Sequence, residues 1–312
     1  GVVDETMTLG DLVLVNTLMI QLYIPLNFLG VIYREIKQSL TDMDRMFSLL
    51  NTEKEITDSP NAHPLHIDNP SRGPDVRFEN VSFHYESKRE ILRNVSFNIP
   101  AGTTTAVVGQ SGAGKSTLAR LLFRFYDVQS GKIMIDEQNI ADVTQLSLRK
   151  AIGIVPQDTV LFNDTIGYNI AYGDPSASFE EVEQAAIMAN AHEFISKFPN
   201  KYETIVGERG VTMSGGQKQR ISIARALLKK TDILILDDCL SAVDSKTEKR
   251  ITSQLNEFLT DKTSIFITHR LFNSINFDLI IVMENGAIIE KGTHEELLIN
   301  KGYYNDQFNK KV

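Results

Sequence analysis

The chain has 312 residues, of which 42% are hydrophobic and 23% charged, as in a folded protein with room for one large domain and a smaller part. The net charge of −8 argues against nucleic acid as a partner, because proteins that bind nucleic acid usually carry a basic surface. The single cysteine, Cys239, excludes an internal disulfide. Because the chain begins with Gly1 rather than Met, we expect it to be a fragment or a processed product.

The first predicted element is a membrane helix over about residues 12–33. These 22 positions, between Asp11 and Arg34, contain no charged residue, and about 20 apolar residues in a helix span a bilayer. A core helix of a soluble protein is the alternative, although 22 uncharged residues is long for one. The run is interrupted by polar or helix-disfavouring residues, which are Asn16, Thr17, Gln21, Pro25, Asn27 and Gly30.

The asparagines of this segment fall on one side of the predicted helix. Asn16 and Asn27 share a face with Ile20 and Tyr23, because the spacing is i, i+4, i+7, i+11. Polar groups inside a span must face protein or a water-filled path rather than lipid. We therefore expect a helix that lines a pathway within a bundle, with a kink at Pro25.

The segment after the span is predicted to lie on the cytoplasmic side. Basic residues mark that side of a membrane helix, and here they are Arg34, Lys37 and Arg45. Apolar residues near one face predict that the helix continues to Leu50. Residues 51–75 then hold four prolines among polar residues, which predicts a linker before a second domain that starts near Val76.

From Val76 onward the pattern predicts strands that alternate with helices. Residues 76–85 and 91–99 alternate between apolar and polar positions, as antiparallel strands do. Further strands are predicted over 103–108, 132–135, 152–155, 233–236, 264–268 and 279–283, and helices over 118–125, 180–191 and 217–228. Asn285-Gly286 predicts a hairpin turn. This order favours an α/β domain with a mainly parallel core sheet.

The stretch from Gly109 to Thr117 matches the phosphate-loop pattern G-x-x-x-x-G-K-[ST] between a predicted strand and a predicted helix. Lys115 is predicted to reach the β- and γ-phosphates of a nucleoside triphosphate, and the Ser116 hydroxyl to ligate Mg²⁺. A glycine-rich turn with a stray lysine is the alternative. The predicted binding residues are Gly109, Ser111, Gly112, Gly114, Lys115, Ser116 and Thr117.

A second chemical landmark follows the apolar strand 233–236. Asp237 stands at its carboxyl end, where open α/β sheets bind ligands, and is predicted to hold Mg²⁺ opposite Ser116. The alternative is a strand that ends in a solvated turn. Cys239, close by, is predicted to be a small buried residue rather than a nucleophile.

A third landmark is Ser214-Gly215-Gly216-Gln217, in front of a predicted helix. Ser214 is a good N-cap, and glycines allow the backbone to approach a ligand, so this helix N-terminus is predicted to be a second anion site. The chain would then have two phosphate-facing surfaces, this turn and the phosphate loop, but only one phosphate loop. This suggests a dimer in which the surfaces of one subunit complete the sites of the other.

This set of motifs resembles the nucleotide-binding subunit of an ATP-binding-cassette (ABC) transporter. Ser214 to Gln217 match the signature motif of that family, with Met213 where leucine is usual. The resemblance covers roughly residues 76–305 and implies a P-loop NTPase domain over 76–312, with a mainly parallel core sheet, an antiparallel β subdomain and a helical subdomain. It implies ATP and Mg²⁺ as ligands, and it makes residues 1–50 the end of a transmembrane domain.

The resemblance also assigns roles to further residues. Tyr85 matches the aromatic residue that stacks on adenine, and Gln157 matches the glutamine that senses Mg²⁺ and the attacking water. His269 matches the histidine that contacts the γ-phosphate. Ser241 to Asp244 match the loop that crosses the dimer interface, and Val206 to Gly210 resemble the coupling segment of exporters.

Asp238 departs from the family pattern, because active members carry glutamate there to polarise the attacking water. A carboxylate one methylene shorter lies about 1 Å or more out of place, which can cost on the order of 100-fold in rate. Asp-Asp resembles the weakened subunit of heterodimeric exporters. The N-terminal run, with Pro25 to Gly30, Tyr33 to Glu35 and Gln38 to Leu40, instead resembles Atm1-type exporters of mitochondria and bacteria.

These resemblances lead us to expect the ATP-hydrolysing part of an exporter half-transporter, with Asp238, His269 and Gln157 as catalytic candidates. The expected partners are a second half-transporter subunit, identical or different, the membrane and a small transported molecule, and no nucleic acid. The nucleotide-binding domain would lie on the cytoplasmic or matrix side. The alternatives are a regulatory subunit that hydrolyses ATP weakly or not at all, and a soluble ABC ATPase. Atm1-type relatives suggest a glutathione-linked or metal-related substrate.

Overall fold

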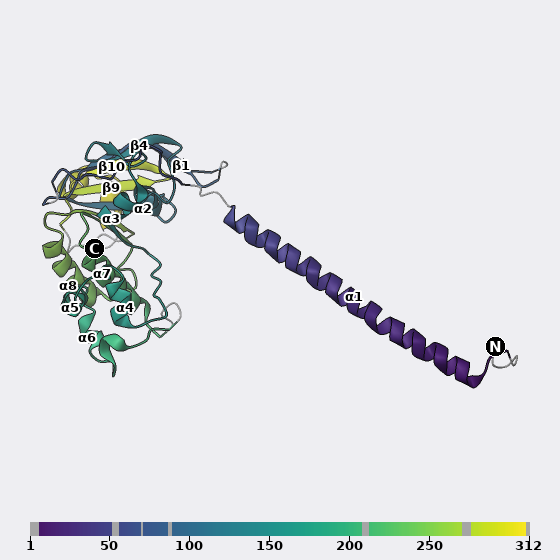
Figure 1. The fold of residues 1–312 in the computed structure, drawn as a ribbon. Helices are drawn as coiled ribbons and strands as arrows, with labels where there is room; N and C mark the ends of the chain where they lie inside the picture. The colour runs from purple at the N-terminus through teal and green to yellow at the C-terminus, as the bar shows by residue number, and fades with distance from the viewer. Residues whose placement is uncertain are drawn as a thin grey trace. The chain divides into compact units, whose positions relative to one another are not determined.

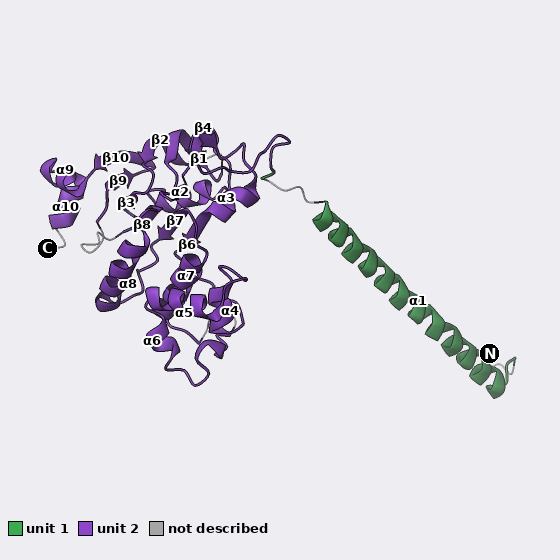
Figure 2. Ribbon diagram, turned by 60° about the vertical axis from the view of Figure 1, so that its left-hand side comes forward, with its two compact units in different colours: residues 1–57 green, residues 58–312 purple. Residues whose placement is uncertain are grey.

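The computed structural model describes residues 6–51, 56–69, 71–86, 89–207, 212–269 and 276–309. The chain divides into two compact units, residues 1–57 and 58–312, which Figure 2 colours separately.

The first unit contains one helix, α1 (Leu9–Leu50), of 42 residues. Thr8 begins it with a capping box, in which its hydroxyl accepts from the Asp11 N–H and the Asp11 carboxylate accepts from the Thr8 N–H. The helix continues through Pro25, and none of its residues is buried. At about 1.5 Å per residue its length is roughly 60 Å, about twice the hydrocarbon thickness of a bilayer. It is thus long and apolar enough to cross a membrane and to extend beyond it.

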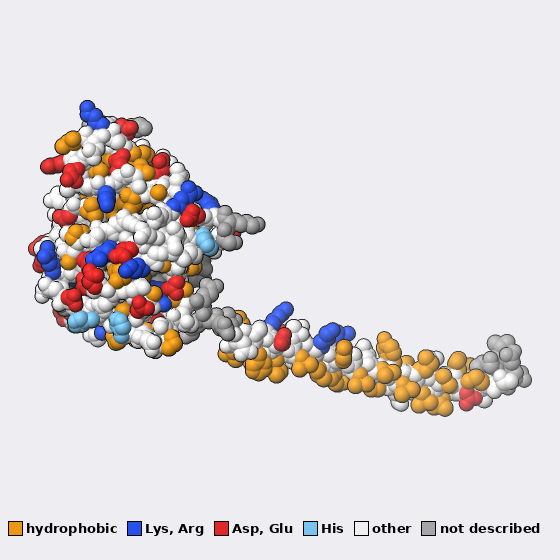
Figure 3. Space-filling view, turned by 90° about the horizontal axis from the view of Figure 1, so that it is seen from above, with side chains coloured by type: hydrophobic (Ala, Val, Ile, Leu, Met, Phe, Trp, Pro, Cys, Tyr) orange, Lys and Arg blue, Asp and Glu red, His pale blue; other side chains and the backbone are white. Residues whose placement is uncertain are grey.

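Side-chain chemistry changes along α1. Hydrophobic side chains cover most of its length, and Lys and Arg side chains stand in its C-terminal half (Figure 3). The prediction of one helix that continues past the apolar run is confirmed by its bounds, Leu9–Leu50.

The second unit contains two sheets (Figure 1). The first is antiparallel, with strand order β2-β1-β4-β5, and consists of β1 (Val76–His84), β2 (Glu90–Ile99), β4 (Ser130–Ile135) and β5 (Gln138–Asn139). The predicted pairing of the first two strands is confirmed: Phe78 lies opposite Phe97, and their rings stack with centroids 4.5 Å apart.

The second sheet has six strands in the order β10-β9-β3-β8-β7-β6. These are β3 (Thr104–Gly109), β6 (Ile152–Val155), β7 (Ile233–Asp237), β8 (Thr263–Thr268), β9 (Leu279–Glu284) and β10 (Ala287–Gly292). All neighbours pair in parallel except β9 and β10, which form the hairpin predicted at Asn285-Gly286. The sheet is therefore mainly parallel, as predicted. Every residue of β7 and β8 is buried, which explains the apolar run 233–236 in β7 and the apolar centre 265–267 of β8.

Helices complete the second unit. They are α2 (Lys115–Leu122), α3 (Gln145–Ala151), α4 (Ile166–Ala171), α5 (Phe179–Met188), α6 (His192–Ile195), the 3₁₀ helix η1 (Lys201–Glu203), α7 (Gly215–Leu228), α8 (Ser245–Phe258), α9 (His294–Ile299) and α10 (Tyr303–Asn309). Helices α4, α5 and α6 form a helical part beyond the end of the six-stranded sheet, with α7 leading into it (Figure 1).

Two predicted helices differ from the structure. The helix expected over 180–191 is α5, which ends earlier, at Met188, because Asn190 adopts a left-handed φ of 52° before α6 begins at His192. The helix expected over 118–125 is α2, which begins three residues earlier because Gly114 takes the N-cap position and ends before Arg124, at φ 52°.

The predicted linker 51–75 belongs in part to the second unit, which starts at Asp58. The His63 N–H donates to the Asp142 carbonyl at 3.2 Å, and the Leu65 N–H donates to the Ser147 hydroxyl at 2.8 Å. The proline-rich segment is therefore extended, but it is not a flexible linker over its whole length. Backbone groups in residues 58–69 form hydrogen bonds with distant residues of the second unit.

Candidate functional site

The phosphate loop joins the end of β3 to α2 through glycines in left-handed conformations. Gly112 has φ 81° and Gly114 has φ 96°. A Cβ on Gly114 would stand 2.7 Å from Leu92 Cδ2, whereas a Cβ on Gly112 would meet nothing within 4 Å. Since Gly114 is the N-cap of α2 and has no side chain, the first turn of this helix is left without a side-chain cap. Its N–H groups are therefore available to an anion.

Lys115 is turned back onto the loop that carries it. Its side chain is 4% exposed, and its Nζ donates to the carbonyls of Gly109 and Gln110, each at 2.8 Å. Burial lowers its pKa to about 8, against the opposing effect of the Asp237 and Asp238 carboxylates. A phosphate oxygen would be a stronger partner for this buried ammonium than the loop carbonyls are, because it carries a full negative charge.

The predicted Mg²⁺ ligands Ser116 and Asp237 lie side by side. The Ser116 hydroxyl donates to Asp237 Oδ1 at 3.0 Å, although the two residues are 121 positions apart. Asp237 is 8% exposed, and burial raises the pKa of its carboxyl, an effect that the Ser116 hydrogen bond opposes. A hydroxyl and a carboxylate oxygen at this distance fit the oxygen ligands that Mg²⁺ prefers.

His269 and Asp238 flank this pair from neighbouring strand ends. His269 Nδ1 lies 3.1 Å from the Gly109 carbonyl oxygen and 3.3 Å from Lys115 Nζ. Asp238 follows β7 with a left-handed φ of 45°, and its N–H donates to the Ile267 carbonyl at 2.8 Å. The parallel order of β3, β8 and β7 is what brings these residues to one edge of the sheet.

Tyr85 stands at the other side of the loop, after β1. Its hydroxyl lies 3.3 Å from Thr117 Oγ1 and accepts a hydrogen bond from Arg120 Nη1 at 3.1 Å. Its ring packs edge-on against those of Phe83 and Tyr126, with centroids 4.9 and 5.1 Å away, and the side chain is 41% exposed. One edge and the hydroxyl are thus fixed, while part of the ring stays open to a ligand.

A cavity of about 300 Å³ lies beside these groups, and among the described residues its lining does not include Gly109, Asp237 or Asp238. It is lined by Tyr85, Arg89, Ile91, Ser111, Gly112, Gly114, Lys115, Ser116, Thr117, Arg120, Gln157 and His269. Arg89, Ile91 and Arg120 were missed by the sequence analysis. Arg120 could have been found, because it lies four residues after Ser116 on the same helical face.

The Ser214–Gln217 turn is not part of this cavity, whose lining among the described residues contains none of the four. Ser214 is the N-cap of α7 and forms a capping box with Gln217: the Ser214 hydroxyl accepts from the Gln217 N–H at 3.3 Å, and Gln217 Oε1 accepts from the Ser214 N–H at 2.9 Å. A Cβ on Gly216 would stand 2.8 Å from the Ala242 carbonyl oxygen, so this turn packs closely on the loop after β7.

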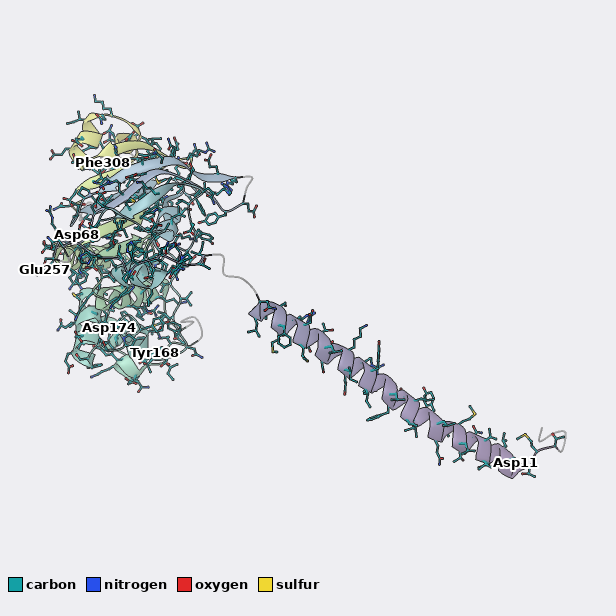
Figure 4. The ribbon with its side chains drawn as sticks, turned by 45° about the horizontal axis from the view of Figure 1, so that its top comes forward. Asp11, Asp68, Tyr168, Asp174, Glu257 and Phe308 are labelled. Atoms are coloured by element: carbon teal, nitrogen blue, oxygen red, sulfur yellow. The ribbon has the colours of Figure 1, made fainter. Side chains whose placement is uncertain are left out.

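An exposed aromatic cluster on the helical part was also missed. Phe162, Tyr168 and Tyr172 are each more than a third exposed, and their rings have centroids 4.5 to 6.3 Å apart. The Arg225 guanidinium lies 5.5 Å from the Phe162 ring and 5.8 Å from the Tyr172 ring. Figure 4 labels Tyr168 on this part of the molecule. The signal in the sequence was three aromatic residues within eleven positions after the Gln157 segment.

Two other predictions concern neighbouring residues. Cys239 is buried, as predicted, and burial raises the pKa of its thiol, which makes it unreactive. The predicted coupling segment begins with buried Val206, but its residues 208–210 lie outside the described ranges.

Comparisons with known proteins agree with this geometry. The family model described as "ABC transporter" matches residues 92–241. The chain is 50% identical over 311 residues to "Iron-sulfur clusters transporter atm1, mitochondrial" of Aspergillus fumigatus, which covers 99% of this chain and 42% of that protein. It is 52% identical over 298 residues to "ATM1-type heavy metal exporter" of Novosphingobium aromaticivorans, which covers 96% of this chain and 48% of that protein.

A solved structure shows the same fold. "Structure of a bacterial Atm1-family ABC exporter with ATP bound" matches with a TM-score of 0.85 and 50% identity, over 98% of this chain and 53% of that one. The chain thus spans about half the length of the curated relatives it matches.

Proposed function

We propose that this chain, whose residues 92–241 match the ABC transporter family model, is the ATP-binding and ATP-hydrolysing part of an exporter half-transporter of the Atm1 type. The observation that carries the proposal is the cavity that joins Tyr85, Lys115 and His269 beside the Ser116–Asp237 pair. The membrane-compatible helix α1 in the same chain supports transport rather than a soluble ATPase.

In the proposed site, ATP occupies the cavity with its base at Tyr85 and its phosphates in the loop from Gly109 to Thr117. Lys115 Nζ moves from the loop carbonyls to the β- and γ-phosphates, because charged oxygens bind an ammonium more strongly than carbonyls do. Arg120 holds the Tyr85 hydroxyl and so fixes the ring against which the base stacks.

Ser116 and Asp237 would hold Mg²⁺, with Gln157 as a further ligand on the cavity wall. When bound, the ion would neutralise charge on the phosphates. The Ser116–Asp237 hydrogen bond already places both oxygens on one side of the loop, so the pair needs little rearrangement. His269 is held beside Lys115, where it can contact the γ-phosphate.

The Ser214–Gln217 turn supports a dimer, since it carries a helix N-terminus but lies outside this chain's own cavity. We infer that it completes the nucleotide site of a second half-transporter subunit, and that closure around ATP drives the membrane helices. The partner is either an identical chain or a different one.

The aromatic cluster of Phe162, Tyr168 and Tyr172 supports the link to the membrane part. It follows Gln157 in the chain and exposes apolar surface that Arg225 keeps in place. Exposed apolar patches of this kind mark protein interaction sites. The proposed occupant is the cytoplasmic or matrix-side end of the transmembrane domain, with the nucleotide-binding domain on that same side.

Asp238 supports a second reading, in which the site hydrolyses ATP weakly. Its carboxylate is one methylene shorter than the glutamate of active members, and misplacement of a base by about 1 Å can cost on the order of 100-fold. In that case the chain serves mainly to bind ATP and regulate a partner subunit.

The names of the relatives suggest the substrate. Iron–sulfur clusters and heavy metals are transported by the proteins so named, and we propose a metal-related or glutathione-linked cargo for this one.

The decisive experiment is MgATP turnover by the full-length protein in liposomes, with Lys115→Ala beside the wild type. Turnover in the wild type that falls by about 100-fold or more in Lys115→Ala supports the proposal, since one lost charge-stabilising donor costs that much. Lys197→Ala, on an exposed Lys197–Glu193 pair, is the matched control and should leave turnover unchanged. Absence of both ATP binding and turnover in the wild type would refute the proposal.

A further inference from the structure

Gln219 is a buried amide that the site described above does not use. It lies on α7, one turn after the Ser214–Gln217 capping box, and is 5% exposed. It does not line the cavity within the described part of the chain. Both ends of its amide are nevertheless occupied: Nε2 donates to the Ser241 hydroxyl at 3.2 Å, and Oε1 accepts from the Ala242 N–H at 3.1 Å.

The loop that Gln219 holds leads directly to Asp238. The Ser241 hydroxyl donates to the Asp238 carbonyl at 2.8 Å, and the Ser241 N–H donates to the same carbonyl at 3.2 Å. On its other side, Asp238 donates its N–H to Ile267 of β8. A continuous chain of hydrogen bonds thus runs from α7 through Ser241 to the backbone of Asp238.

These hydrogen bonds hold the backbone of Asp238 in a conformation that the residue would not readily adopt by itself. Its φ of 45° is left-handed, which costs an L-residue of this type free energy unless the surroundings determine it. The Ser241 hydroxyl can act at once as donor to the Asp238 carbonyl and acceptor from Gln219 Nε2, so it links the two residues directly.

The packing beside Gln219 makes the connection stiff. A Cβ on Gly216 would stand 2.8 Å from the Ala242 carbonyl, and a Cβ on Gly215 would stand 3.3 Å from Ala242 Cβ. The first turn of α7 therefore lies in direct contact with the loop, with no room for a larger residue at Gly216. Gln219 adds two hydrogen bonds to this close contact.

We propose that Gln219 is a positioning residue that couples the Ser214–Gln217 turn of α7 to Asp238. The inference rests on the proposed function, in which the turn binds the partner's nucleotide and Asp238 serves this chain's own. Engagement of the turn by the partner's ATP then sets the backbone of Asp238 through Gln219 and Ser241. The side chains of Gln219 and Ser241 would thus link the two nucleotide sites of a dimer. Gln219 itself would contact neither nucleotide.

The test uses the full-length protein with Gln219→Met, Ser241→Ala and the double variant. Methionine keeps the length and volume of glutamine but removes both hydrogen bonds. We expect kcat for MgATP to fall about tenfold and KM to change less than about twofold, because a misplaced catalytic carboxylate slows the reaction without weakening binding. The kcat of the double variant should be no lower than that of the less active single variant, because each single substitution already interrupts the same series of hydrogen bonds.

Thr263→Val is the matched structural control. The Thr263 hydroxyl is buried and joins Pro74 to Gly102 at the opposite end of the sheet from the site. It should lower the thermal midpoint as much as Gln219→Met does, with kcat unchanged. A kcat loss in Thr263→Val equal to that in Gln219→Met would overturn the proposal, and so would additive losses in the double variant or an unchanged kcat in Gln219→Met.

Amide hydrogen exchange separates this inference from the proposed function. Gln219→Met should speed exchange at the N–H groups of Ala242, Ser241 and Asp238, and Thr263→Val should not. If the wild type shows no ATP turnover, the result counts against hydrolysis by this chain. The exchange rates still test whether Gln219 couples the turn of α7 to Asp238. Unchanged exchange at Asp238 in Gln219→Met would overturn the coupling even in an active enzyme.

Discussion

Two helix N-termini in this chain carry the same kind of chemistry and are built in opposite ways. Helix α2 begins at Gly114, which has φ 96° and no side chain to cap the first turn. Helix α7 begins at Ser214, which forms a complete capping box with Gln217. The first helix start has no side-chain cap and is open to a ligand. The second is self-sufficient and needs none in order to fold.

The difference indicates what each end is for. An uncapped turn with a buried lysine beside it is stabilised by a bound anion, so α2 suits a site that its own chain fills. A capped turn that packs on Ala242 stays ordered when no ligand is present. The N-terminus of α7 can therefore keep its conformation until a second subunit binds there. Four experiments test this difference between the two helix starts.

Gly114→Ala should have the largest effect, and Gly112→Ala is its control. Both glycines have positive φ, which costs alanine about 1–2 kcal/mol. Only a Cβ on Gly114 meets Leu92 Cδ2, at 2.7 Å, which adds about 1–3 kcal/mol of overpacking. Thermal unfolding should show a clearly lower midpoint for Gly114→Ala than for Gly112→Ala, and ATP binding should be lost with it. Equal midpoints would mean that the loop is not braced by Leu92.

Asp238→Glu should raise turnover if the site at α2 is weakened. A carboxylate restored to its usual reach should increase kcat by up to about 100-fold, with little change in ATP affinity. The measurement is steady-state MgATP hydrolysis by the full-length protein beside the wild type. A wild type that already matches the variant in kcat would remove the case for a weak site.

The Lys115 ammonium predicts a pH dependence at α2 that α7 should not share. Its pKa is about 8 in the ligand-free fold, against 10.5 in an unfolded chain. Between these values the folded state holds fewer protons than the unfolded state, so this group makes the ligand-free fold more stable as pH rises. Phosphate binding requires the charged form, so affinity for a non-hydrolysable ATP analogue should fall by up to about tenfold per pH unit above 8.

The pH effect is measured by titration from about pH 7 to about pH 9.5, with Lys115→Met as reference. That variant should bind weakly and with no slope above pH 8. A slope that survives in Lys115→Met would assign the titration to another group.

Ser214→Ala should have the smallest effect, and Ser178→Ala provides a matched control. Ser178 forms the same capping box with Glu181 at the start of α5, with distances of 3.3 and 3.0 Å against 3.3 and 2.9 Å at Ser214. Each substitution should cost about 1 kcal/mol of stability. Turnover should fall about fivefold further in Ser214→Ala alone, because only that turn is proposed to serve a partner's nucleotide. Equal turnover in the two variants would contradict a composite site.

Much of the fold follows from local sequence pattern. The apolar run of β7 indicates a sheet that is covered on both faces, and Asn285-Gly286 predicts its hairpin with the left-handed φ values of 49° and 80° that such turns need. Helix boundaries were harder to predict, because α5 ends at Met188, just before a left-handed Asn190 that periodicity does not reveal. The packing of residues 58–69 on the second unit was also beyond sequence pattern, since proline content reports extension and not docking.

The candidate site shows the same division. The motif from Gly109 to Thr117 is contiguous, so sequence alone determined the loop, its lysine and its expected ligand. Only the tertiary structure decided that Lys115 meets His269, that Arg120 holds Tyr85, and that Gln219 reaches Ser241. Backbone periodicity and phosphate-binding patterns act over a few residues, whereas these contacts depend on the order of strands in the sheet and on the packing of α7 against the loop after β7.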